Sequence, residues 1–75
     1  MEFCILLERR SGEDFTATAW STEKEAREQA EVFLCQFLPF TMQTATLEEM
    51  EQYCWENDLA YIEFSFHQLP TGGNQ

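Results

Sequence analysis

Basic residues are missing from nearly two-thirds of this 75-residue chain, because residues 28–75 contain no lysine or arginine. All four bases lie in residues 1–27, and the later part carries eight acids, so most of the formal charge of −10 belongs to residues 28–75. Proteins that bind a nucleic-acid backbone neutralise its phosphates with clusters of Lys and Arg, and anionic membranes attract the same residues. The sequence therefore argues against direct binding to nucleic acid or to a membrane surface.

Long apolar runs and paired cysteines are also missing. Residues 1–8 have no basic start and too short an apolar run for a signal peptide, and no stretch approaches the ~18 apolar residues of a membrane span. Cys4, Cys35 and Cys54 make an odd number without a C-x-x-C motif. Because secreted domains held by disulfides usually carry an even and denser set, we expect a cytoplasmic chain with reduced thiols.

Glycine and proline are scarce, with three and two residues. The chain is 44% hydrophobic and 15% aromatic, which is typical of a folded protein despite the charge. The length allows one hydrophobic core. We expect residues 1–69 to form a single domain and residues 70–75, which include Pro70 and two glycines, to form a flexible tail.

Two alternating runs around Gly12 predict a β-hairpin at the start of the chain. We assign one set of the alternating residues to the buried face of the sheet: Phe3, Ile5, Leu7, Phe15, Ala17 and Ala19. This assignment leaves the other set on the outer face: Cys4, Leu6, Thr16, Thr18 and Trp20.

Two helices should follow the hairpin, because Thr22 with Glu25 and Thr46 with Glu49 both fit the capping box. The first is expected from residue 23 to about residue 38, before Pro39, and the second from residue 47 to about residue 57. Their apolar stripes have helical spacing: Ala26, Ala30, Phe33, Leu34 and Phe37 in the first, and Leu47, Met50, Tyr53 and Cys54 in the second.

Residues 59–69 alternate again and predict a last strand, with Ala60, Ile62, Phe64 and Phe66 on its inner face. The expected class is α+β, in the order β-β-α-α-β, with a three-stranded, mainly antiparallel sheet and two helices packed on one face. Two positions remain open for the last strand, parallel beside the first or antiparallel beside the second. This arrangement should bury six of the seven phenylalanines: Phe3, Phe15, Phe33, Phe37, Phe64 and Phe66.

Catalytic and metal-binding motifs are absent from the sequence. Glu63, Ser65 and His67 share a strand face, but neighbours two apart on a strand lie about 7 Å from each other, which we take as too far for a proton relay. Cys4, Cys35, Cys54 and His67 lack the close-spaced pairs of a structural zinc site. We therefore expect no enzyme activity, no cofactor and no metal.

The second helix carries the most distinctive surface pattern. No Lys or Arg lies within four residues of its acids, and like charges at this spacing destabilise a helix by about 0.2–0.5 kcal/mol per pair. Tryptophan is enriched among residues that dominate binding energy. We identify as candidate partner-binding residues Glu48, Glu49, Glu51, Trp55, Glu56 and Asp58. Alternatively this is a solvated helix face, with Trp55 folded over Leu59 or over the linker between the two helices, residues 40–45.

These observations favour a non-catalytic interaction module that docks a carboxylate-rich surface on a basic protein. Proteins that bind nucleic acid commonly have large basic clefts, so we expect the partner to be a protein of this class. In length, acidity and lack of catalytic motifs the chain is similar to the small inhibitors that phages direct at host nucleic-acid machinery, including anti-CRISPR and DNA-mimic proteins. That similarity implies an inhibitor.

An alternative hypothesis places the interface on the sheet. The outer face would present Leu6, Trp20 and Tyr61, which are more apolar than a bare sheet face usually is. The chain would then be a small structural or regulatory subunit that forms a homodimer or joins a larger complex through these residues.

Overall fold

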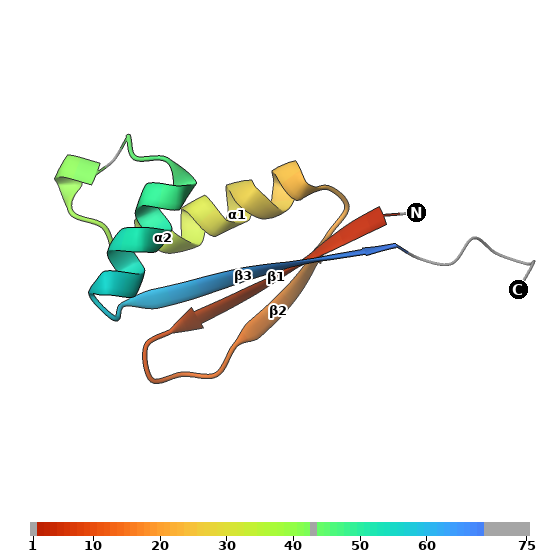
Figure 1. The fold of residues 1–75 in the computed structure, drawn as a ribbon, viewed down its shortest axis with the longest axis horizontal. Coiled ribbons are helices and arrows are strands. Elements are labelled where there is room, and N and C mark those ends of the chain that lie inside the picture. The colour runs from red at the N-terminus through yellow and green to blue at the C-terminus, as the bar shows by residue number, and fades with distance from the viewer. Residues whose placement is uncertain (1, 43, 69–75) are drawn as a thin grey trace, which may run out of the picture.

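The computed structural model describes residues 2–42 and 44–68. Its elements are β1 (Glu2–Arg10), β2 (Thr16–Trp20), α1 (Glu23–Cys35), the short 3-10 helix η1 (Phe40–Met42), α2 (Leu47–Glu56) and β3 (Ala60–Gln68) (Figure 1). The predicted α+β class and the order of strands and helices are confirmed. The expected tail, residues 70–75, lies outside the described residues.

The sheet has the order β2-β1-β3, and both of its strand pairs are antiparallel. Neither position expected for the last strand is right, because β3 lies antiparallel beside β1. The cause is the course of α1, which starts after β2 and carries the chain back along the sheet (Figure 1). β3 therefore starts opposite Arg10, which pairs with Ala60, and runs in the same direction as β2.

The helices cover the face of the sheet that contains Cys4 and Leu6, which are 1% and 0% exposed. The face assignment for the first two strands is therefore wrong. Cys4 pairs with Trp20, which packs against the core, whereas Ala19 pairs with Ile5 on the uncovered face.

The apolar run of β1 and the size of the side chains on β2 explain which face of the sheet is covered. Residues 3–7 are all apolar, so the alternation of β1 fits either face equally well. On β2 the choice lies between Trp20 and two alanines, and the ring of Trp20 buries far more apolar area than two methyl groups. On β3, Ile62 and Phe64 pack against the core as expected.

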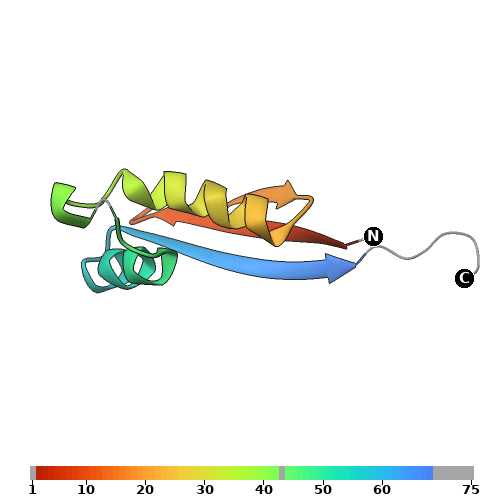
Figure 2. The same cartoon turned by 90° about the horizontal axis from the view of Figure 1, so that it is seen from above.

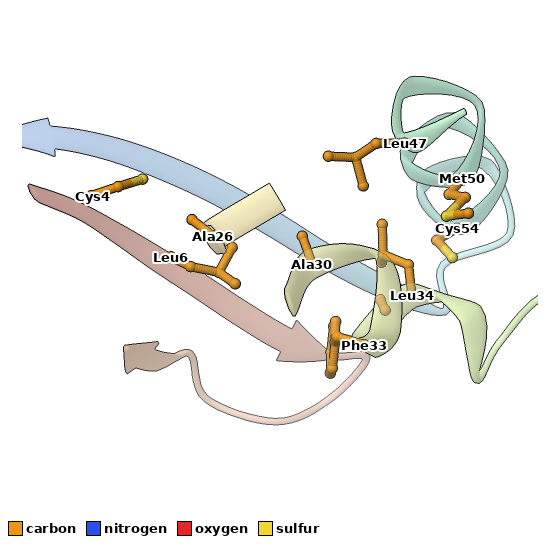
Figure 3. Packing of buried hydrophobic residues seen from close by; sticks show 10 residues of the cluster. Cys4, Leu6, Ala26, Ala30, Phe33, Leu34, Leu47, Met50 and Cys54 are labelled. Atoms are coloured by element: carbon orange, nitrogen blue, oxygen red, sulfur yellow. The ribbon is translucent and has the colours of Figure 1, made fainter. Parts of the chain in front are cut away.

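The core is small and is shared by both helices and two strands (Figure 3). Within residues 2–42 and 44–68, its ten buried residues are Cys4, Leu6, Ala26, Ala30, Phe33, Leu34, Leu47, Met50, Cys54 and Ala60. Of the six phenylalanines expected to be buried, only Phe33 is, while Phe15 and Phe66 are 48% and 61% exposed. Phe66 faces the helix side of β3, but the strands project beyond the start of α1 and leave it uncovered (Figures 1 and 2).

Both helices begin at the expected threonines. The Thr46 hydroxyl accepts a hydrogen bond from the Glu49 amide, and the Glu49 carboxylate accepts one from the Thr46 amide, which completes a capping box. At α1 the Thr22 hydroxyl accepts from the Glu25 amide, while the Glu25 carboxylate bonds to the same hydroxyl. No helix in the described part of the chain is long and apolar enough to cross a membrane.

Candidate functional site: an acidic surface around α2

The candidate residues lie on the second helix and just beyond its C-terminal end, where Glu51 and Trp55 line one hollow, Glu49 and Glu56 line another, and Glu48 borders both. We call this set, Glu48, Glu49, Glu51, Trp55, Glu56 and Asp58, the α2 surface. The capping box fixes where α2 begins, and the buried side chains of Leu47, Met50 and Cys54 fix which side faces the core. The acids are thereby turned outward.

Trp55 is the large exposed side chain of this surface. It is 67% exposed, so it does not fold back over Leu59 or the linker. Beside it, between α2 and β3, lies a hollow of about 230 Å³. The hollow is lined by Leu34, Glu48, Glu51, Gln52, Trp55, Ala60, Tyr61 and Ile62. An indole ring and two carboxylates therefore surround one concave site.

Glu48 has a basic neighbour that lies far away in the sequence. Its Oε2 is 2.8 Å from Nη2 of Arg27, which projects from α1. No base lies within four residues of Glu48 along the chain, but the fold brings Arg27 to it from α1. The hydrogen bond from Arg27 lowers the pKa of Glu48, so this carboxylate stays charged to lower pH.

Glu51 has the opposite environment. Partial burial against the helix surface raises its pKa, and the nearby charge of Glu48 raises it further. Within residues 2–42 and 44–68 the Arg27–Glu48 contact is the one ion pair. The charge of Arg27 lowers the pKa of Glu51 but offsets these two effects only in part, so a further cation from outside could stabilise the charged form of this carboxyl at the edge of the hollow.

The remaining acids of the α2 surface have hydrogen-bond partners within the chain. The Glu49 carboxylate is used in the capping box, and Glu56 accepts a hydrogen bond of 2.9 Å from Gln52. Asp58, at a φ of 53°, accepts hydrogen bonds from the hydroxyls of Ser11 and Tyr61. Glu49 and Asp58 thus have structural roles, and Glu51 and Glu56 are the acids that a partner can reach with least disturbance of the fold.

The structure separates the three residues expected to form a sheet interface. Leu6 and Trp20 lie on the helix-covered face, and the Trp20 indole donates a hydrogen bond of 2.8 Å to the Thr18 hydroxyl. Tyr61 lies on the uncovered face, where its ring is 4.5 Å from the Arg9 guanidinium. The apolar residues that do lie on the uncovered face of β1 are Phe3, Ile5 and Leu7. The signal that could have found them is the unbroken apolar run of residues 3–7.

Ser65 and His67 form a hydrogen bond of 2.6 Å between Oγ and Nε2, so the distance argument against their contact is wrong. The two side chains approach each other on the uncovered face of β3. Among the described residues no carboxylate forms a hydrogen bond with His67. The His67 ring stacks on the Phe3 ring, with 5.2 Å between the ring centroids.

The three cysteines are free thiols, with Cys4 and Cys54 buried and Cys35 exposed. The buried position of Cys4 differs from the outer face expected for it. Burial raises the pKa of the Cys4 and Cys54 thiols. Three or more His, Cys, Asp or Glu side chains placed to hold a metal ion are not found in the described part of the chain.

Comparison with known proteins gives one result. No family model, curated protein or solved structure matches this chain.

Proposed function

We propose that this protein is a non-catalytic interaction module that docks its α2 surface on a basic protein. The observation that carries the proposal is an exposed Trp55 beside a hollow with the partly desolvated Glu51 at its edge. An aromatic ring with flanking carboxylates is suited to an arginine or lysine side chain, which stacks on the ring and pairs with the acid.

A basic side chain from the partner would occupy the hollow between α2 and β3. Its charge would offset the burial that Glu51 already has, so binding would stabilise this carboxylate. Glu48 would remain held by Arg27 at the rim, while Glu56 would extend the negative surface along the helix. Specificity would come from Trp55, and the rate of association from the overall charge.

The partner class that best fits this surface is a protein that binds nucleic acid. Its phosphate-binding groove presents spaced cations, which carboxylates along a helix can occupy in place of phosphates. We infer that the protein acts as an inhibitor of the DNA-mimic or anti-CRISPR kind. Three free thiols support a cytoplasmic location, where thiols stay reduced.

Capture from a cell extract tests the proposal. The immobilised protein should retain basic proteins at low salt, and the double variant Glu51→Lys/Glu56→Lys should lose them, because it reverses the two acids of the α2 surface that have no role in the capping box, the Asp58 contacts or the ion pair. The matched control is Glu13→Lys/Asp14→Lys in the hairpin turn, which is exposed and makes the same change in net charge. It should retain the same proteins.

A further variant separates the role of the ring from that of the charge. Trp55→Ala keeps every carboxylate and should weaken binding by roughly 2 kcal/mol, as expected for a hot-spot residue. Equal loss in the Glu13/Asp14 control would show that net charge alone governs capture, and retention by the Glu51/Glu56 variant would contradict docking through α2.

A further inference from the structure

The uncovered face of the sheet, which we call the open face, is apolar along its central strand. Phe3, Ile5 and Leu7 lie on this side of β1, and each is half-buried by its neighbours. Ala17 and Ala19 flank them on β2, where small side chains leave the surface flat and open to close approach. No helix covers this side in the described part of the chain (Figures 1 and 2).

The pattern of β1 is that of a strand buried on both faces. An antiparallel sheet with one face in water normally alternates apolar and polar residues, whereas strands covered on both sides read as continuous apolar runs. β1 has five apolar residues in succession, Phe3 to Leu7. Cys4 and Leu6 pack under the helices. The alternate residues of β1 have the pattern of a strand whose second face is also covered.

Charge distinguishes the open face from the rest of the surface. Its charged side chains in residues 2–42 and 44–68 are Arg9 and Glu63, of opposite sign, in a chain of formal charge −10. The guanidinium carbon Cζ of Arg9 lies 5.3 Å from the centroid of the Phe15 ring and 4.5 Å from that of the Tyr61 ring. These two contacts hold Arg9 on the open face. The open face is therefore neutral, and a basic partner has no reason to select it.

We propose that the open face is covered by the open face of a second copy of this chain. Two such copies repel each other least through their neutral faces, and their apolar central strands bury each other. An isologous contact brings the same patch of both copies together, so an open face with one charge of each sign meets a face without net charge. This inference is independent of the proposed function, since it uses the side of the sheet away from the helices.

The size of the contact predicts a weak dimer. Three strands about 4.8 Å apart, over the ~20 Å from residue 3 to residue 9, offer roughly 300 Å² of flat sheet per copy. This lies below the roughly 800 Å² per partner of a stable interface. The dimer should therefore be reversible and depend on concentration.

Sedimentation of the purified full chain over a range of concentrations tests this inference. The wild type should show a monomer–dimer equilibrium, and added salt should strengthen it by screening repulsion between two acidic copies. Ala19→Glu and Ala19→Arg should each lower the association constant by at least about tenfold, because either buries an unpaired charge. Val32→Glu and Val32→Arg are matched controls on α1, where Val32 is 65% exposed, and the dimer should persist in both.

The Ala19→Arg variant separates burial of a charge in the interface from a general effect of net charge. It reduces the net negative charge and would therefore strengthen any association that is limited by repulsion alone. Ala19 is exposed on the edge strand β2, and unchanged far-ultraviolet circular dichroism checks that the variants fold. A wild type that stays monomeric at every concentration and salt overturns the inference. So does a dimer that is insensitive to both Ala19 variants, because it would use another surface.

Discussion

At the scale of single residues, Glu51 is a carboxyl group whose charged form suits the binding of a cation but is disfavoured by its place in the fold. Partial burial and the neighbouring Glu48 raise its pKa in the folded protein. A raised pKa means that the folded state gains stability from this group only while it is protonated, and loses that gain as the pH rises through the folded-state pKa. The charged form of Glu51 therefore favours the folded state less than its protonated form does.

Replacing Glu51 by Gln should make the isolated protein more stable at neutral pH. We expect a gain of about 0.3 kcal/mol at pH 7, the size of one like-charge contact on a helix, and no difference near pH 3, where both states are protonated. Urea unfolding at the two pH values measures this, with Glu13→Gln in the exposed hairpin turn as control. A variant less stable than the wild type at pH 7 would contradict the assigned environment.

At the scale of elements, the sequence predicts the existence and the order of the strands and helices well. It predicts poorly which face of a strand is buried. Thr22 and Thr46 mark both helix starts because a cap is a local interaction between residues three apart. The face of β1 depends on what packs against it, and five consecutive apolar residues leave that choice to the tertiary structure. The Arg27–Glu48 contact joins residues 21 apart, so spacing along one helix could not reveal it.

Two neighbouring leucines test the observed faces. Leu6 is fully buried under the helices, and Leu7 lies half-buried on the open face. Leu6→Ala should therefore cost about 3 kcal/mol of unfolding free energy and Leu7→Ala about 1 kcal/mol, because only the first leaves an enclosed cavity. Denaturant unfolding at low protein concentration compares them. A larger loss for Leu7→Ala would mean that the helices cover the other face.

At the scale of the whole molecule, the net charge of −10 is not spread evenly. The α2 surface concentrates carboxylates around one exposed tryptophan, while the open face carries one charge of each sign. These two surfaces suit different occupants, a basic protein and a second copy. Their dependence on salt should have opposite signs, since screening weakens attraction to a basic partner and weakens repulsion between two acidic copies.

The salt dependence of capture tests whether the protein docks through the carboxylates of α2. Basic proteins bound to the immobilised wild type at low salt should elute as the salt concentration rises toward molar, and the Glu51→Lys/Glu56→Lys variant should retain none of them at any salt concentration. Proteins that stay bound through the whole salt range, and equally to both forms, would contradict docking through the carboxylates of α2.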